Sequence, residues 1–139
     1  LVGDTVCLAL LDLDFFKRIN DELGHQAGDR ALRHVVEVLR LELRRDEPML
    51  RVGGEEFVVL LRQPLGAGWE RMDGLRRKLQ SVLFQPGDGH EERCLTMSCG
   101  VACSPDDAID VSGLMRTADL RLRLAKQNGR NRVVARDSA

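Results

Sequence analysis

The chain has 139 residues, of which 43% are hydrophobic and 31% charged, a balance that fits one globular domain with a sizeable core. Its formal net charge is -1, so no basic field favours bulk nucleic-acid binding. No apolar run reaches membrane-spanning length and no signal-peptide pattern is present, so we expect a cytoplasmic domain that makes no membrane contact of its own.

The first element is an apolar run over residues 5–14, which predicts a central strand. Because the chain opens almost directly into this strand, we expect a module of a longer protein. Asp12 and Asp14 lie at the carboxyl end of the strand, two residues apart, so their side chains should point the same way. Carboxylates clustered there would suit magnesium, with a substrate phosphate as a further ligand. They would equally suit a cap on the following turn, and these residues alone leave both interpretations open.

Two helices are predicted next, a short one over residues 16–23 and an amphipathic one over residues 28–45. Backbone N–H groups at the turn from strand to helix would suit a phosphate, and Lys17 would add a positive charge. Asn20 and Asp29 carry complementary polar groups: a carboxylate can accept from the N1–H and amine of guanine, and an amide can donate to its acceptor edge. Helix polarity and a favourable charge at a helix N-terminus explain the same two residues equally well.

Residues 49–52 and 57–62 predict a β-hairpin around the sequence GGEE. Alone, this pattern is typical of a turn with solvated acids. In the proposed sheet, however, the hairpin neighbours the first strand, which would bring its turn close to Asp12. Three carboxylates near one point repel one another without a cation, so the arrangement favours two bound metal ions. Gly53 and Gly54 would then let a phosphate or a base approach the backbone.

The second half of the chain predicts two more helices and two more strands. With their connections, the segments in chain order are a polar loop over residues 63–70, a helix with Leu75, Leu79, Val82 and Leu83 on its buried face, a turn over residues 85–92, a strand over residues 93–103, a helix over residues 111–129 and a closing strand over residues 132–135. The order β-α-α-β-β-α-β-α-β indicates an α/β sandwich around a split βαβ-type sheet.

Two basic residues, Lys126 and Arg130, flank the end of the last predicted helix. Cations at a helix C-terminus are favourable because of the helix dipole alone, while a bound triphosphate would give them a second role.

The cysteines form no CxxC pair, and the three histidines complete no zinc-binding spacing with them. We therefore predict buried, reduced thiols. The four cysteines are Cys7, Cys94, Cys99 and Cys103, and the histidines are His25, His34 and His90.

In combination and order, these features resemble one known family, the GGDEF-domain diguanylate cyclases. The matching stretches are "LALLDLDFFKRINDELGHQAGD", "RVGGEEF", "MSCGVA" and "ADLRLRLAKQNGRNRV". The resemblance covers nearly the whole chain, so it implies a single GGDEF domain over residues 1–139. It also implies a fold similar to the palm of polymerases and nucleotidyl cyclases, with a central, mostly antiparallel sheet flanked by helices.

The activity implied by the resemblance is the condensation of two GTP molecules into cyclic di-GMP with release of two pyrophosphates. By position, Asp12 and Glu55 resemble side-chain ligands of two Mg²⁺ ions, for which Mn²⁺ could substitute, and Leu13 would contribute its carbonyl. Glu56 would help to deprotonate the attacking 3′-hydroxyl. The resemblance further implies a homodimer, because each domain holds one GTP, and a fused upstream sensory domain.

The resemblance also assigns the GTP-binding residues. They are Asn20 and Asp29 for the guanine, Phe15, Phe16 and Lys17 at the phosphate turn, Gly53 and Gly54 beside the nucleotide, and Lys126 and Arg130 for the triphosphate.

The sequence departs from the family pattern in three places. The product-inhibition motif Arg-x-x-Asp is here Arg44-x-x-Glu47, so this site is degenerate, and the two side chains would alternatively pair along a helix. The usual "ALYRAK" is "RLRLAK", with Arg121 and Arg123 in place of a small residue and a tyrosine. The customary "LTGLxNR" segment before the first strand is not in the sequence.

Two other functions are considered beside an active cyclase. One is a non-catalytic GTP- or cyclic-di-GMP-binding regulatory module, for which Arg44 and the altered last helix leave room. The other is a structural domain without a ligand, which would leave the clustered acids unexplained.

Overall fold

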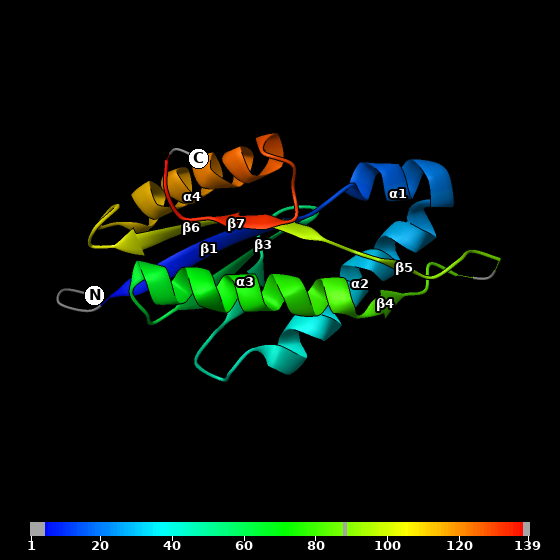
Figure 1. Ribbon diagram of the computed structural model, residues 1–139, viewed down its shortest axis with the longest axis horizontal. Helices are drawn as coiled ribbons and strands as arrows, with labels where there is room; N and C mark the ends of the chain where they lie inside the picture. Colours follow the sequence, from blue (N-terminus) through cyan, green and yellow to red (C-terminus); the bar gives the residue numbers. More distant parts are fainter. Residues whose placement is uncertain (1–4, 88, 138–139) are drawn as a thin grey trace.

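The computed structural model describes residues 5–87 and 89–137. A five-stranded sheet of order β2-β3-β1-β6-β7 forms its centre (Figure 1). Neighbouring strands are antiparallel except for β6 and β7, which are parallel, so the predicted, mostly antiparallel sheet is confirmed. The strands are β1 (Val6–Leu13), β2 (Met49–Arg51), β3 (Glu56–Leu61), β6 (Met97–Ser104) and β7 (Arg132–Val134).

The described residues form four helices, which are α1 (Phe16–Leu23), α2 (His25–Glu42), α3 (Leu65–Ser81) and α4 (Val111–Gln127). Three of them cover the faces of this sheet, while α1 packs on α2 beyond the end of the sheet (Figure 1). Helix α4 lies on one face, while α2 and α3 lie on the other. No helix among the described residues combines the length and the apolar character that crossing a membrane requires.

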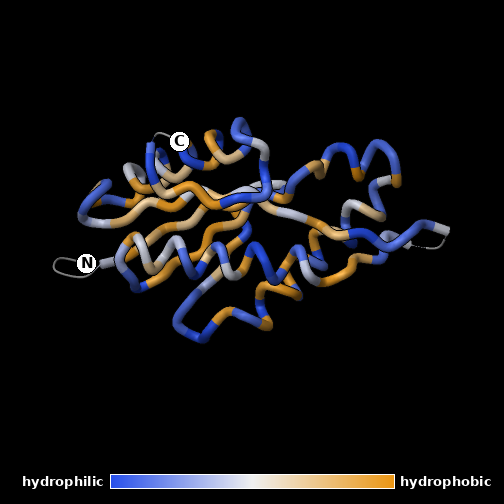
Figure 2. Tube along the Cα trace, viewed as in Figure 1, coloured by the Kyte–Doolittle hydropathy of each residue, from blue (hydrophilic) through white to orange (hydrophobic). Residues whose placement is uncertain are grey.

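The strand β1 is buried on both faces, which explains why its sequence is continuously apolar. Cys7, Ala9 and Leu11 pack into the core beneath α2 and α3, whereas Leu8 and Leu10 pack beneath α4. In Figure 2 the apolar residues accordingly follow the strands and the helix faces turned toward them.

The backbone of helix α4 comes into close contact with β6 at Gly100. A Cβ atom added at Gly100 would lie 2.1 Å from the carbonyl oxygen of Ala118 and 2.4 Å from the amide nitrogen of Leu122. Only glycine leaves room for this contact, which fixes the height of α4 above the sheet.

Helices α2 and α3 differ from the predicted ranges. Helix α2 begins at His25, because Gly24 (φ 93°) ends α1 and immediately starts the next helix. Helix α3 begins at Leu65, so the predicted loop over residues 63–70 is mostly helical. Val82 and Leu83 lie beyond its end, and Leu83 is exposed rather than part of a buried helix face.

A small second sheet was not predicted. It consists of β4 (Leu83–Phe84) and β5 (Arg93–Cys94), so the strand predicted over residues 93–103 is in fact two strands. The turn predicted over residues 85–92 connects them, apart from residue 88, which lies outside the described residues. Phe84 packs on His34, with ring centroids 5.3 Å apart.

The cysteine prediction is correct for three residues and wrong for one. Cys7, Cys99 and Cys103 are buried free thiols, but Cys94 is exposed. The reason is its position on the two-stranded hairpin, which extends beyond the end of the main sheet (Figure 1).

Candidate functional site

The carboxyl end of β1 and the β2–β3 turn meet as the sequence predicted. Asp12 pairs in register with Glu56 of β3, and the N–H of Leu13 donates to the carbonyl of Glu55 over 3.3 Å. Asp12 is only 4% exposed, while Glu55 and Glu56 are half-buried. The three acids therefore gather at one end of the central strands.

Asp12 is held in an unfavourable environment for a carboxylate. Burial, partly opposed by Lys126 and reinforced by Glu55 and Glu56, raises the pKa of Asp12 to about 6. Lys126 donates a hydrogen bond to its Oδ2. Its Oδ1 is buried and finds no hydrogen-bond partner among the described residues. A buried, unpartnered carboxylate oxygen beside two further acids is suited to a cation.

The protein supplies few ligands for such a cation. Among residues 5–87 and 89–137, no three His, Cys, Asp or Glu side chains converge closely enough to hold a metal ion by themselves. Magnesium fits this situation, because it is commonly held by one or two carboxylates together with substrate phosphates. The free Oδ1 of Asp12, with Glu55 and the Leu13 carbonyl nearby, is compatible with that arrangement.

Asp14, which the sequence grouped with Asp12, has different partners. Its carboxylate accepts from the hydroxyl of Thr96 over 2.7 Å, from the hydroxyl of Ser98 over 2.6 Å and from the backbone N–H of Asn131 over 3.0 Å. It is 4% exposed. Asp14 thus joins β1, β6 and the segment before β7, and its oxygens are occupied by these donors.

Three residues near Asp14 adopt left-handed backbone conformations. Phe15, Arg130 and Asn131 have φ of 60°, 63° and 49°, and they are the only non-glycine residues of the described ranges with positive φ. The ring of Phe15 lies 4.8 Å from the guanidinium of Arg18 and 5.0 Å from that of Arg130. Backbone strain of this kind is characteristic of functional sites. The structure thus brings Arg130 to the predicted phosphate turn.

The other two residues predicted at this turn differ in exposure. Phe16 is half-buried and packs on the main core, whereas Lys17 is exposed.

The two predicted guanine readers are brought together by α1 and α2. A Cβ added at Gly28 would lie 1.8 Å from Oδ1 of Asn20, so the Asn20 side chain lies directly against the helix that carries Asp29. Asp29 opens onto a pocket of about 360 Å³ between α2 and the hairpin. Its other lining residues are Leu32, Arg33, Val36, Glu37, Arg51 and Phe57.

Three polar residues of this pocket were not predicted. Arg33 and Glu37 follow Asp29 by four and eight residues, so helical spacing was the signal that they share its face. Arg51 stabilises the β2–β3 turn, because its Nε donates to the carbonyls of Gly53 (3.2 Å) and Gly54 (3.0 Å). A Cβ added at Gly54 would meet no described atom within 4 Å, so the turn is open on that side.

The Arg44–Glu47 pair is not helical, because α2 ends at Glu42. Glu47 is 5% exposed, and its two oxygens accept from Nε (3.0 Å) and an NH2 group (2.7 Å) of Arg71 on α3. It also accepts from the backbone N–H of Arg44 over 2.8 Å. The hydrogen bonds from Arg71 lower the pKa of Glu47. The Glu47 side chain therefore points inward, while that of Arg44 is exposed.

The two unusual arginines of α4 have different environments. Arg121 is 4% exposed and forms a two-pronged ion pair with Asp107, with both distances 2.8 Å. It also donates to the carbonyl of Val101 over 2.8 Å. Arg123 is exposed and pairs with Asp119 along the helix. The Arg121 side chain thus connects α4 to β6 and to Asp107 in the loop that follows this strand.

Comparison with known proteins identifies close relatives. The sequence profile described as "Diguanylate cyclase, GGDEF domain" matches residues 2–132. The chain is 36% identical over 135 residues to the probable diguanylate cyclase DgcT of Escherichia coli, covering 94% of this chain and 29% of that protein. It is 36% identical over 137 residues to the response regulator PleD of Caulobacter vibrioides, covering 98% of this chain and 30% of that protein. The chain thus spans under a third of these curated relatives.

Solved structures agree. The GGDEF domain of DgcB from Caulobacter crescentus, in complex with c-di-GMP, superposes with a TM-score of 0.88 at 34% identity, covering 99% of this chain and 81% of that one. The active GGEEF domain of a diguanylate cyclase from Vibrio cholerae superposes with a TM-score of 0.86 at 26% identity, covering 99% and 86%.

Proposed function

Since the chain belongs to the GGDEF domain family of diguanylate cyclases, we propose that it condenses two GTP molecules into cyclic di-GMP and releases two pyrophosphates. The observation that carries the proposal is the buried Oδ1 of Asp12, which has no hydrogen-bond partner in the described ranges and lies beside Glu55 and Glu56. Binding of a nucleotide alone would not need all three acids.

The proposed roles follow from position. Asn20 and Asp29 bind the guanine, and Lys126 and Arg130 bind the triphosphate. Positioning and charge neutralisation provide most of the acceleration in phosphoryl-type transfer, so these residues would act mainly by orientation. Glu56 would accept the proton of the attacking 3′-hydroxyl.

Mg²⁺ is the proposed cofactor, with Mn²⁺ as a substitute. Asp12, Glu55 and the Leu13 carbonyl would hold it, and when bound it would neutralise phosphate charge and acidify the attacking hydroxyl. The carboxylates present match the oxygen ligands that Mg²⁺ prefers.

Each domain would hold one GTP, so two copies must face each other for the reaction. In a longer parent protein, an upstream sensory domain would control that encounter. We propose a cytoplasmic location, because GTP is available there.

The test is direct. The purified chain is incubated with GTP and Mg²⁺, and cyclic di-GMP and pyrophosphate are quantified by mass spectrometry and a coupled assay, beside a Glu55→Ala control. Formation of both products by the unaltered chain, and of neither by the Glu55→Ala variant, supports the proposal. If a folded dimer binds GTP but forms no cyclic di-GMP, the cyclase function is overturned and a regulatory module replaces it.

A further inference from the structure

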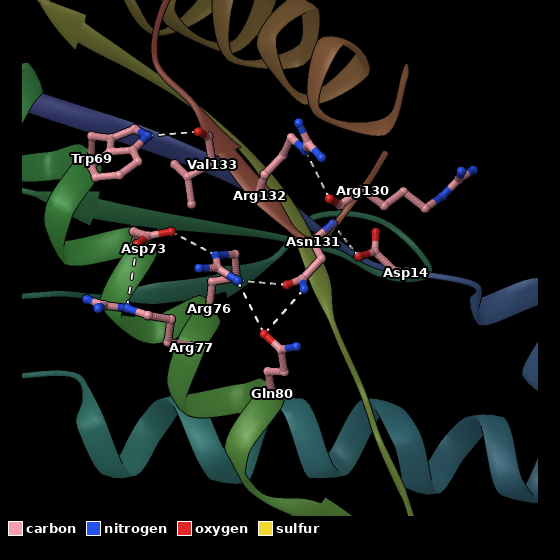
Figure 3. Close-up of polar contacts among 10 residues, drawn as sticks. All are labelled: Asp14, Trp69, Asp73, Arg76, Arg77, Gln80, Arg130, Asn131, Arg132 and Val133. Atoms are coloured by element: carbon pink, nitrogen blue, oxygen red, sulfur yellow. Dashed lines mark hydrogen bonds and ion pairs between the residues drawn. The ribbon is translucent and has the colours of Figure 1, made fainter. Parts of the chain in front are cut away.

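The segment between α4 and β7 is held in place by hydrogen bonds to α3, the helix that lies on the opposite face of the sheet from α4. Asn131 is the contact point: its Oδ1 accepts from the NH1 group of Arg76 on α3 over 2.9 Å, and its Nδ2 donates to Oε1 of Gln80 over 3.3 Å (Figure 3). Its backbone N–H donates to Asp14 over 3.0 Å. Asn131 is therefore fixed by both its side chain and its backbone.

This fixed residue determines the path of its neighbour. Arg130 and Asn131 are consecutive residues with φ of 63° and 49°, a conformation that L-residues avoid unless their surroundings impose it. With Asn131 anchored, the guanidinium of Arg130 is directed to the ring of Phe15, 5.0 Å away, at the phosphate turn. Without the anchor, the segment would relax and Arg130 would sample other positions.

Arg76 is itself held in place. Its Nε donates to Asp73 over 2.8 Å, and its side chain is only 15% exposed. Within residues 5–87 and 89–137, its side chain forms no hydrogen bond or ion pair with Asp12 or with a proposed substrate-binding side chain. Its role can thus be only indirect.

We propose that Arg76 is a positioning residue for triphosphate binding, acting through Asn131 to hold Arg130 in its binding position. The proposal rests on the proposed function for the identity of the ligand, but its structural half can be tested without any nucleotide.

The chain offers a matched control next to Arg76. Arg77 pairs with the same carboxylate, Asp73, over 3.5 Å, and within the part of the chain that the structure describes it makes no hydrogen bond to Asn131 (Figure 3). Since Asp73 has two arginine partners, replacing either one leaves it paired. Both variants therefore keep Asp73 paired, but Arg76→Ala alone loses the contacts with Asn131 and Gln80, and it removes a side chain that is 15% exposed where that of Arg77 is 67% exposed.

The first measurement is amide hydrogen exchange of the nucleotide-free protein by NMR. In Arg76→Ala the N–H of Asn131 should exchange at least about tenfold faster than in the unaltered protein. The reason is that the segment opens more often when Arg76 no longer holds the Asn131 side chain, which breaks the hydrogen bond from this N–H to Asp14. Arg77→Ala should leave it unchanged. Equal exchange at Asn131 in both variants would overturn the proposal, whatever the protein does with GTP.

The second measurement is affinity for a GTP analogue with a methylene group between the α- and β-phosphorus atoms, which cannot turn over. We expect Arg76→Ala to weaken binding about tenfold and Arg77→Ala to leave it within about twofold, a difference typical of one charged hydrogen bond. In an Arg130→Ala background, Arg76→Ala should have no further effect. Full additivity of the two substitutions would overturn the proposal.

A merely structural role has a different signature: lower thermal stability with unchanged analogue affinity and unchanged exchange at Asn131. Asn131→Gly, which keeps the left-handed backbone but removes the acceptor, should reproduce the effects of Arg76→Ala. If the unaltered chain binds the analogue but forms no cyclic di-GMP, only the proposed function fails. If it forms cyclic di-GMP and Arg76→Ala binds normally, only the positioning role fails.

Discussion

At the scale of single residues, the most informative group is Asp12. It is nearly inaccessible, one oxygen has no partner among the described residues, and burial raises its pKa to about 6 from 3.8. Because the folded-state pKa lies above the unfolded one, ionised Asp12 opposes folding. That cost is absent at low pH and appears as the pH rises through the interval between the two values.

Asp12→Asn should therefore stabilise the metal-free protein. At about pH 7.5 we expect its free energy of unfolding to exceed that of the unaltered chain by about 1–2 kcal/mol, and the difference to vanish near pH 4. Urea unfolding with a chelator present measures this. Adding Mg²⁺ and GTP should raise the melting temperature of the unaltered chain but not that of Asp12→Asn, and cyclase activity should be lost in the variant. A variant that is less stable at neutral pH would contradict the prediction.

Glu47 should behave in the opposite way. Hydrogen bonds from Arg71 hold its pKa below the ordinary 4.5, so its ionised form supports folding, and that support disappears as the pH falls through the lowered pKa. We expect Glu47→Gln to cost about 2 kcal/mol at neutral pH, and the cost to shrink on acidification. Urea unfolding across pH provides the check, with Glu42→Gln, whose partner Lys78 is exposed, as the control. A cost that is independent of pH would refute the assignment.

The inward orientation of Glu47 also bears on feedback control. Because Arg71 and the Arg44 backbone occupy its carboxylate, the pair cannot present two side chains to a ligand. We expect Arg44→Ala to leave inhibition by added cyclic di-GMP within about twofold, since an exposed side chain without its partner contributes little. Dose–response curves for the unaltered chain and Arg44→Ala measure this inhibition. A large rise in the half-inhibitory concentration in Arg44→Ala would show that Arg44 belongs to an inhibitory site.

At the scale of elements, the contact between α4 and β6 depends on Gly100. Gly100→Ala should destabilise the fold by about 3 kcal/mol or more, because the added Cβ would clash with backbone atoms of α4, which have no alternative rotamer to adopt. Gly66→Ala in α3 is the control: no described atom lies within 4 Å of the added Cβ, so this change should be neutral or stabilise by about 0.5–1 kcal/mol. Thermal unfolding compares them, and equal melting temperatures would refute the prediction.

The sequence predicted the elements with a clear local signal: the continuous apolar run of β1, the helical periodicity of α4 and the turn residues of the β2–β3 hairpin. It missed the first third of α3, over residues 65–70, because the glycines there resemble a loop. In the structure, Gly68 is needed for close packing, since an added Cβ would lie 2.7 Å from the sulfur of Cys7. It also missed β4 and β5, which are two residues each and are defined only by pairing with one another.

The candidate site was likewise predicted only where local sequence motifs indicate it. Motif order located Asp12, Glu55 and Asn20, and the register of β1 with β3 brings Asp12 beside the β2–β3 turn. The contacts of Arg76 with Asn131 join positions 55 residues apart. No spacing rule covers such pairs, because only the folded sheet brings α3 near the end of α4.

At the scale of the whole molecule, the proposed reaction, in which two domains share the site, implies that activity depends on protein concentration. At concentrations where the chain is monomeric, the initial rate should rise with the square of protein concentration, and it should become linear once dimers predominate. Analytical ultracentrifugation of the same samples gives the monomer fraction. A rate that stays proportional to concentration among monomers would show that one domain suffices.

The central position of β1 has a consequence for biosynthesis. This apolar strand is made first, yet its two partners, β3 and β6, end only at Leu61 and Ser104. Until both have left the ribosome, the emerging chain exposes a hydrophobic segment that no local contact can cover, and such long-range pairing is intrinsically slow. Truncations that end before β6 should therefore aggregate rather than fold partially.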